Sequence, residues 1–531
     1  MTTHEGAQAG AEPAARMGAA IASGREGNVP ADAVLLAQET DHRLGANLSA
    51  LAGSQVVTWI MSLLWTVVVP REVGPAGMGT LVTAWSATGV LGVLLGLGTR
   101  NFLVREMVAR PAAAPALVGT AVILRLCLAP LFVAGTILYA TYAHVGSEER
   151  LVLGLAAGAT FLTLLADPVQ ATFQAVERMR FLAYSDIISK TLQSLVGVAL
   201  AVLGYGAVGL TTCWLVAAGI IVILNAWWVR PMVRVEWRTD LRRMRSLVRA
   251  SLAYYAFGLF YMLYLWIDSV MLALMAPPRV VGWYGVPTKL FATLMFVPVI
   301  ISTAWLPRLV NAFEQGADRL RATARAPIEL VIVLALPICV AAAMTAGPVI
   351  HLLYGSSYGP SVPVLVVLVL ALPFMYLNIM LNQVLIAANR PMTWTWVMAG
   401  AALVNPVLNF VLIRVCQSRL HNGAIGASIS LVLTEVLVVV VGTFVVGRRV
   451  LGSLSVGRLG RAGMAAGAMW GAMFVTRRFT AVAELAAGGA VFVALVGILR
   501  LATEEEVALM RAGVTRLRGM LVPAGGRGGR E

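Results

Sequence analysis

The sequence predicts an all-α, polytopic membrane protein with about fourteen transmembrane helices. The chain has 531 residues, of which 59% are hydrophobic and only 12% are charged. An average soluble domain holds roughly 25% charged residues, so this composition excludes a water-soluble globular protein. About 20 consecutive apolar residues span a bilayer, and runs of that length recur along the chain. The four cysteines, Cys127, Cys213, Cys339 and Cys416, lie far apart without a CxxC pattern, which excludes a disulfide framework.

The first 44 residues are small and polar and are interrupted by proline and glycine, so we expect a disordered tail over 1–44. The first long apolar run begins near Asn47, and a cleavable signal peptide is therefore not expected. The expected spans are about 47–69, 79–99, 115–140, 151–174, 184–204, 208–229, 250–275, 286–306, 327–349, 363–386, 393–413, 423–447, 460–476 and 480–499. Only a tight turn at Arg477-Arg478 separates the last two.

The placement of arginine and lysine predicts that both termini are cytoplasmic. With the N-terminus inside, 31 of the 40 basic residues fall in inner segments and eight in outer segments. Inner loops of membrane proteins carry such an excess of positive charge. The net charge of +15 then reflects topology, and no solvated basic domain is present, so no nucleic-acid partner is expected.

The loops are too short for a folded catalytic domain. The longest outer loop, about 351–362, has around a dozen residues, and no GxxxxGK[ST] pattern occurs. The glycines Gly89, Gly92, Gly96 and Gly98 lie inside an expected span without a preceding strand, which indicates close helix packing. No loop holds a nucleophile beside a base, so an enzyme is not expected.

An internal repeat divides the chain. Gly79 opens the second expected span and Gly282 opens a similar segment 203 residues later, and at the same offset Arg105 meets Arg308. A second echo relates residues 174–178 to 386–390. We therefore predict two six-helix lobes of the same orientation, as in parallel-repeat transporters. The expected division is an N-lobe at 45–229, a basic linker at 230–249, a C-lobe at 250–447, a helix pair at 448–500 and a cytoplasmic tail at 501–531.

Several segments carry a family resemblance. Arg71-Glu72-Val73-Gly74-Pro75-Ala76-Gly77-Met78-Gly79 resembles the R-x-L-G-P-x-x-x-G loop of bacterial polysaccharide flippases. Leu97-Gly98-Thr99-Arg100-Asn101-Phe102-Leu103-Val104-Arg105-Glu106 is similar to their "LG…REIAR" segment, and Phe173-Gln174-Ala175-Val176-Glu177-Arg178-Met179-Arg180 to their "FQGLERMR". Ile267-Asp268-Ser269-Val270-Met271-Leu272, Val281-Gly282-Trp283-Tyr284 and Leu306-Pro307-Arg308-Leu309 resemble "IDSIMLG…VGxY…LPRL". The motifs keep their order over about 45–450.

The chain therefore resembles the Wzx-type, lipid-linked oligosaccharide flippases of the MOP superfamily, which also includes multidrug MATE exporters and lipid II flippases. The resemblance implies two lobes around a central cavity that opens alternately to the two sides of the bacterial cytoplasmic membrane. It implies an undecaprenyl-diphosphate-linked oligosaccharide as substrate, membrane lipids as partners, and a polysaccharide polymerase or export machinery as a further partner. Lipid II flippases tend to carry arginine after the seventh-helix aspartate, and this chain has Ser269 there. This departure weakens the assignment to lipid II, which stays the alternative substrate.

Three embedded cations are candidates for contact with a diphosphate, because arginine and lysine bind phosphate and embedded charges are costly. Arg125 lies about ten residues into the third span, Lys190 two turns into the fifth, and Lys289 at the start of the eighth. Each has a structural alternative. Arg125 would pair with Asp167, Lys190 with Asp186 at i,i+4, and Lys289 would anchor its helix at the interface.

Two carboxylates are candidates for ion coupling. Asp268 lies within the seventh span, where a carboxylate could bind a proton or Na⁺, and Asp167 precedes Pro168, whose ring frees backbone carbonyls. The alternatives are a structural hydrogen bond for Asp268 and a hinge at Pro168. No other cofactor and no metal is expected.

Uncharged polar residues predict a sugar-binding wall or, equally, hydrogen bonds between helices. They are Asn378, Asn382 and Gln383 in the tenth span and Asn405 and Asn409 in the eleventh, with Gln55 and Gln193 as further members. The aromatic run from Tyr254 to Trp266 winds around the seventh span, and we expect most of it to pack against helices or lipid.

A MATE-like antiporter of cationic drugs is the other alternative function. Such a protein would need an acidic cavity without cations.

Overall fold

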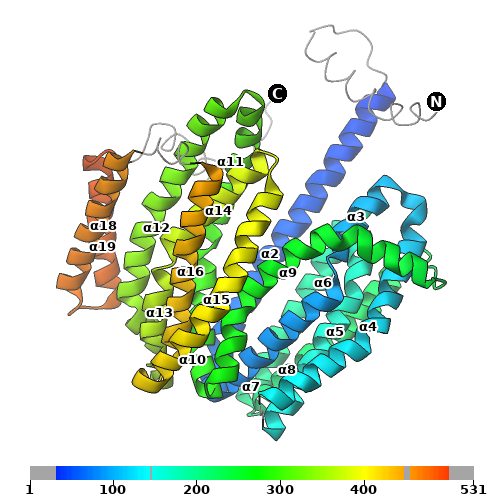
Figure 1. Ribbon diagram of the computed structural model, residues 1–531, viewed down its shortest axis with the longest axis horizontal. Coiled ribbons are helices and arrows are strands. Elements are labelled where there is room, and N and C mark those ends of the chain that lie inside the picture. The colour runs from blue at the N-terminus through cyan, green and yellow to red at the C-terminus, as the bar shows by residue number, and fades with distance from the viewer. Residues whose placement is uncertain (1–30, 144–145, 448–454, 502–531) are drawn as a thin grey trace, which may run out of the picture.

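The structure is a computed structural model that describes residues 31–143, 146–447 and 455–501 (Figure 1). The described part is helical and contains no strand, which confirms the predicted all-α class. The helices of the first half are α2 (Ala31–Gly96), α3 (Thr99–Ala109), α4 (Ala114–Tyr142), α5 (Ser147–Ala175), α6 (Met179–Thr191), α7 (Gly197–Val202) and α8 (Gly206–Val229). Those of the second half are α9 (Leu241–Met275), α10 (Pro278–Leu294), α11 (Phe296–Glu314), α12 (Ala317–Tyr354), α13 (Ser361–Val369), α14 (Leu372–Ala387), α15 (Pro391–Leu420) and α16 (Gly423–Val446). The pair α18 (Val456–Thr476) and α19 (Ala481–Ile498) follows.

Helix α2 is a hairpin with two arms, 31–73 and 75–96. Its backbone leaves the helical region at Gly74, which has a φ of 69°. Glycine adopts this left-handed conformation without the steric cost of a Cβ atom. The rings of Trp65 and Trp85 lie 5.4 Å apart, whereas 20 residues of straight helix would separate them by about 30 Å. The first two expected spans therefore lie side by side as the arms of α2.

Among the described residues, eleven helices are long and apolar enough to cross a membrane, or twelve when α13 and α14, bent by 41°, form one span. The expected number of fourteen spans is therefore not confirmed. Two features of the structure explain why fewer spans are found than expected. The two arms of α2 are counted together as one candidate span across the break at Gly74. Helix α18 is rich in glycine and alanine and carries Arg458 and Arg461, which lowers its apolarity.

Two helices begin earlier in the chain than the sequence predicts. Residues 31–44, expected to be disordered, belong to α2, while residues 1–30 lie outside the described part. Helix α9 begins at Leu241, inside the expected linker 230–249, because the Oδ1 of Asp240 accepts a hydrogen bond from the backbone N–H of Arg243 at 2.7 Å. Such a cap satisfies a free N–H of the first turn. Helix α9 thus includes part of the segment expected as a linker, and the tail after Leu501 lies outside the described residues.

The second sequence echo has the same backbone conformation in both copies. Between α5 and α6, Glu177 has a φ of 56°, and between α14 and α15, Asn389 has a φ of 54°. The N–H of Arg178 donates to the carbonyl of Phe173 at 2.9 Å, and the N–H of Arg390 donates to that of Leu385 at 2.8 Å. Both helices therefore end with the same C-terminal motif, in which a left-handed residue is followed by an N–H that bonds back to the last turn.

The first echo places Gly79 and Gly282 in direct, reciprocal contact. A Cβ atom at Gly79 would collide with the carbonyl of Pro278, and a Cβ atom at Gly282 would collide with the carbonyl of Pro75. Reciprocal contact of equivalent residues is the property of a twofold axis. A pseudo-twofold axis therefore passes between α2 and α10. In Figure 1 the first half lies on one side and α10 to α16 lie on the other, while α9 extends across to the first half, and α18 and α19 lie at one edge beside α12. The lobe boundaries at 229 and 250 stay predictions.

The close approach at this axis allows a stability prediction. Replacing Gly282→Leu should lower the free energy of unfolding by roughly 1–3 kcal/mol, because the new side chain has only the backbone of α2 to enter. Thermal unfolding of the purified protein in detergent measures the change. Gly463→Leu is the matched control, since open space surrounds a Cβ atom at Gly463. An equal effect of both substitutions would contradict the close crossing of α2 and α10.

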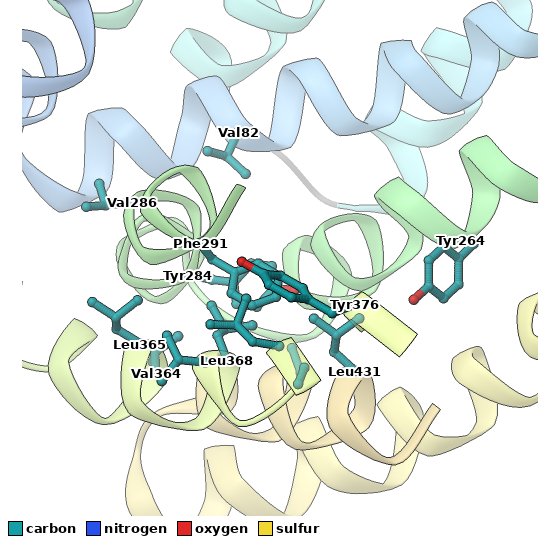
Figure 2. Close-up of a cluster of buried hydrophobic side chains, with 14 of the residues drawn as sticks. Val82, Tyr264, Tyr284, Val286, Phe291, Val364, Leu365, Leu368, Tyr376 and Leu431 are labelled. Carbon is teal, nitrogen blue, oxygen red and sulfur yellow. The ribbon is translucent and has the colours of Figure 1, made fainter. Parts of the chain in front are cut away.

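The main core is built around α10. Figure 2 shows Val82 of α2 pointing toward α10, and Tyr284 and Phe291 of α10 lying close to Leu368 of α13. Tyr284 and Phe291 are 3% and 6% exposed. Each fully buried large apolar side chain contributes roughly 1.5–3 kcal/mol. This packing fixes the rotation of α10 about its own axis.

Candidate functional site

A cavity of about 830 Å³ lies where the first half meets α9 and α10. Both arms of α2 and residues of α3, α5, α6 and α8 line it on one side, and α9 and α10 line it on the other. Of the ten residues predicted to bind substrate or ions, three line this cavity: Asp167, Lys190 and Lys289. Gln193 also lines it, whereas the side chain of Gln55 lies outside those that the structure describes.

Three cations and one carboxylate line the cavity. The cations are Arg100, Lys190 and Lys289, and the carboxylate is Asp167. The Nη1 of Arg100 lies 2.9 Å from the Oδ1 of Asp167, and 41% of the Arg100 side chain is exposed. Arg100 was named above only within a family motif, and its place in the cavity was not predicted. Positive charge therefore predominates in the lining.

Arg125 lies behind this wall and does not line the cavity. It is 1% exposed, and its Nη2 lies 2.9 Å from the Oδ2 of Asp167 and 3.0 Å from the Oγ1 of Thr99. Asp167 thus pairs with two arginines at once. The structure favours the pairing alternative for Arg125 over direct ligand contact, because buried charges need a partner. Its Nε and Nη1 have no hydrogen-bond partner among the described residues.

Lys190 is exposed at the end of α6, directly before a short π-helix over Leu192–Val196. In this wider turn the Oγ of Ser194 donates to the carbonyl of Met61 at 2.6 Å, which ties the helix to the first arm of α2. The Nε2 of Gln193 donates to the Oγ of Ser189 at 2.8 Å. Single π-turns often occur at functional sites. Here the turn places Lys190, Gln193 and Ser194 on the cavity wall.

The sequence predicts Lys289 at the start of a span. In the structure, Lys289 lies about three turns inside α10. The difference arises because α10 begins at Pro278, eight residues before the expected span, and proline is well suited to the first helical turn. The Nζ of Lys289 lies 3.6 Å from the ring centroid of Trp65 and 4.6 Å from that of Trp85. An ammonium group is attracted to the face of an indole.

Four tryptophans form an aromatic wall that the sequence analysis missed as a unit: Trp65, Trp85, Trp214 and Trp266. The rings of Trp85 and Trp214 are 6.3 Å apart and nearly perpendicular. In the aromatic run of α9, Tyr255 and Trp266 line the cavity, whereas Tyr264 is buried in the main core. The side chains of Tyr254, Phe257 and Tyr261 lie outside the described ones.

Three asparagines predicted for a sugar wall are instead buried between helices. Asn405 and Asn409 are 0% exposed and Asn378 is 6% exposed. The Nδ2 of Asn409 donates to the Oδ1 of Asp268 at 2.6 Å, and that of Asn405 donates to the Oγ1 of Thr434 at 3.2 Å. Helices α9, α15 and α16 are joined by this network. Each amide thus satisfies a buried polar neighbour, as the interhelical alternative expects, and a part in sugar binding stays a prediction.

The remaining predicted residues also lie away from the cavity lining. The Nδ2 of Asn378 donates to the Oε2 of Glu435 at 2.5 Å, and Asp268 also accepts from the hydroxyl of Tyr284 at 3.3 Å. Asn382 and Gln383 are partly buried and do not line the cavity. Asp268 is 4% exposed, as expected for an embedded carboxylate. Its part in ion coupling stays a prediction.

Comparisons with known proteins identify the class. The sequence profile of a family described as "Polysaccharide biosynthesis protein" matches residues 68–363, more than half of the chain, and the chain belongs to this family. The fold is similar to that of the lipid II flippase MurJ in an inward closed conformation, with a TM-score of 0.63, 13% identity, and coverage of 85% of this chain and 98% of that one. It is also similar to an inward-facing multidrug resistance MATE transporter of the MOP superfamily, with a TM-score of 0.55, 15% identity, and coverage of 75% and 95%. A search of curated protein sequences finds no match.

These findings confirm the resemblance drawn from the motifs. The chain is a multi-pass membrane protein of the polysaccharide biosynthesis family, with the fold of MOP-superfamily flippases and transporters. The two similar structures are described as a lipid II flippase and a multidrug resistance transporter.

Proposed function

We propose that this protein moves undecaprenyl-diphosphate-linked oligosaccharide units from the inner to the outer leaflet of the bacterial cytoplasmic membrane, for polysaccharide biosynthesis. The observation that carries the proposal is the lining of the cavity, which combines Arg100, Lys190 and Lys289 with four indole rings. A diphosphate-linked sugar is a large, anionic headgroup. Moving such a charge through hydrocarbon without partners is prohibitive.

Each part of the headgroup has a complementary group in the cavity. Charge-assisted hydrogen bonds from lysine and arginine to phosphate are about twice as strong as neutral ones. Flat indole rings offer apolar surfaces for the C–H faces of sugar rings, and an indole N–H can donate a hydrogen bond. The polyprenyl tail would remain in the surrounding lipid while the headgroup occupies the cavity. Both chain ends would then lie on the cytoplasmic side, and a polymerase or export complex would take up the product.

The position of the cavity supports an alternating-access cycle. It lies between α9–α10 and the first half, so a relative rotation of the halves would open it to one side at a time. The pseudo-twofold contact at Gly79 and Gly282 provides a point about which equivalent helices can separate. Interfaces between repeated halves hold the binding sites of many transporters.

The cavity lining also bears on the two alternative functions, a MATE-like drug antiporter and a lipid II flippase. A cationic drug, the expected substrate of a MATE-like antiporter, would meet three like charges and only one carboxylate there. Lipid II carries the same polyprenyl-diphosphate group, so the lining accommodates it as well. Ser269, in place of the arginine of lipid II flippases, supports an oligosaccharide of another kind.

The proposal is tested by reconstitution into liposomes with a fluorescent polyprenyl-diphosphate oligosaccharide. Exposure of the headgroup on the far side is read with a membrane-impermeant quencher. We expect protein-dependent exposure of this lipid and no uptake of a fluorescent cationic drug. Preferred translocation of lipid II would assign the alternative substrate, and drug transport without lipid translocation would overturn the proposal.

Ion coupling is a second part of the proposed function, and Asp268 is its proposed site. Asp268 is buried in the asparagine network, and the Oδ1 of Asn409 has no hydrogen-bond partner among the described residues. Oxygen atoms of this kind are ligands for Na⁺, and a carboxylate also accepts a proton.

Replacing Asp268→Asn should abolish the acceleration of translocation by an imposed ion gradient and leave slow, gradient-independent exchange. The amide keeps the shape of the carboxylate and one accepting oxygen but removes its charge. Translocation rates with and without a Na⁺ or proton gradient measure this change. A variant that still responds to both gradients as the unmodified protein does would remove Asp268 from the coupling.

A further inference from the structure

An ammonium group and two indole rings in the cavity cover each other's binding surfaces. Lys289 lies over Trp65 and Trp85, with its Nζ 3.6 Å and 4.6 Å from the two ring centroids. The rings lie 5.4 Å apart and are tilted by 49°. A sugar ring cannot stack on the face of Trp65 while the ammonium occupies it. The same ammonium cannot bind a phosphate fully while it faces the indoles.

The contact is attractive, but a phosphate can replace it. In the part of the chain that the structure describes, the Lys289 ammonium has no carboxylate within 4.0 Å, so the indoles are its main partners. A phosphate oxygen offers a charged acceptor, and a charge-assisted hydrogen bond is stronger than a cation–π contact of this kind. An anionic headgroup that reaches the cavity would therefore draw Lys289 away from the rings.

We propose that Lys289, Trp65 and Trp85 form an exchange site that couples recognition of the diphosphate to recognition of the sugar. The diphosphate takes the ammonium group, and the uncovered indoles then stack on the sugar ring next to it. This inference rests on the proposed function and names the residues that select a sugar-bearing lipid over a sugar-free one. Lys190 and Arg100, in the same cavity, remain for the other phosphate oxygens.

The exchange also changes a contact between the two halves. Lys289 belongs to α10 of the second half, and Trp65 and Trp85 belong to the two arms of α2 in the first half. The side chain of Lys289 is held on the cavity side because the neighbouring Tyr284 and Phe291 are buried in the core. Release of the ammonium therefore loosens α10 from α2 at the moment when the headgroup is bound.

The exchange predicts effects of opposite sign for two lipids. Replacing Trp65→Leu should strengthen binding of sugar-free polyprenyl diphosphate by roughly 3- to 30-fold, because Lys289 then has to leave only the more distant indole of Trp85. The same substitution should weaken binding of the polyprenyl-diphosphate oligosaccharide, because the stacking surface is lost. Binding of both lipids to the full-length protein in detergent, followed by a fluorescent label on the lipid, measures the two affinities. Trp85→Leu should act in the same directions if Trp65→Leu fails to fold.

Two comparisons separate exchange from structural damage. In a Lys289→Met background, Trp65→Leu should no longer strengthen binding of the sugar-free lipid, since no ammonium is released. Trp214→Leu is the matched control, because this indole lines the same cavity without facing the Lys289 ammonium. It should not strengthen binding of the sugar-free lipid.

The outcomes distinguish this inference from the proposed function. If the unmodified protein binds neither lipid, the proposed function fails. If it binds both lipids and Trp65→Leu and Trp85→Leu each weaken both, or change neither, the exchange site fails while the proposed function stands.

Discussion

A protein carrying both Lys190→Glu and Lys289→Glu should lose translocation of polyprenyl-diphosphate oligosaccharide by at least about 100-fold. Each substitution removes a charge-assisted hydrogen bond to phosphate, worth roughly 1.5–3 kcal/mol, and each adds a repelling carboxylate. Every 1.4 kcal/mol corresponds to a factor of ten in binding. Both side chains line the cavity, and no ion pair to a carboxylate is found for either within the described residues. Initial rates of headgroup exposure in liposomes measure the loss.

The double substitution by arginine is the matched control. Lys190→Arg with Lys289→Arg keeps both charges, so translocation should remain within about tenfold of the unmodified rate. Comparable thermal unfolding of the two variants would show that the glutamate variant is folded. A glutamate variant that is folded and translocates at the unmodified rate would contradict a cationic role for the cavity.

Replacing Glu329→Ala should destabilise the protein by roughly 3–5 kcal/mol, because it leaves a buried arginine without its carboxylate. Glu329 of α12 is 3% exposed, and its Oε2 lies 2.9 Å from the Nη1 of Arg458 in α18. Its Oε1 accepts from the Nε of Arg325 at 2.8 Å and from the backbone N–H of Ser455 at 2.7 Å. This carboxylate thus fastens the C-terminal helix pair to the second half. Thermal unfolding in detergent measures the change.

Two controls belong to the Glu329 prediction. Asp318→Ala removes an ion pair to Arg321 on the same helix, but the Asp318 side chain is 96% exposed, so the expected change is below about 1 kcal/mol. Glu329→Met combined with Arg458→Met should recover most of the stability, since an apolar pair replaces a buried ion pair at little cost. If Glu329→Ala were no more destabilising than Asp318→Ala, α18 would not be fastened through this carboxylate.

The sequence was sufficient to predict the all-α class, the repeat and three residues of the cavity, because these depend on apolar length, local turn residues and embedded charges. Asp167, Lys190 and Lys289 were chosen as embedded charges, and the structure brings all three to one cavity. The glycines of the repeat, Gly79 and Gly282, were found by their offset and lie at the pseudo-twofold contact. Charges in apolar segments are conspicuous in a sequence because they are costly there.

The remainder depends on how each helix is rotated against its neighbours. Asn405 and Asn409 share one face of α15, but their spacing does not reveal whether that face meets a cavity or another helix. The structure buries them against α9 and α16. The wall of Trp65, Trp85, Trp214 and Trp266 draws on α2, α8 and α9, so its assembly requires tertiary packing. Only the presence of single tryptophans in several expected spans pointed toward it.

The most direct test of the account is translocation itself, measured in liposomes that contain the unmodified protein, the glutamate pair at Lys190 and Lys289, or the arginine pair. A fluorescent polyprenyl-diphosphate oligosaccharide reports headgroup exposure with and without an ion gradient. We expect rapid exposure with the unmodified protein and the arginine pair and background exposure with the glutamate pair. Background exposure with all three proteins, in the presence and absence of either gradient, would rule out the proposed translocation.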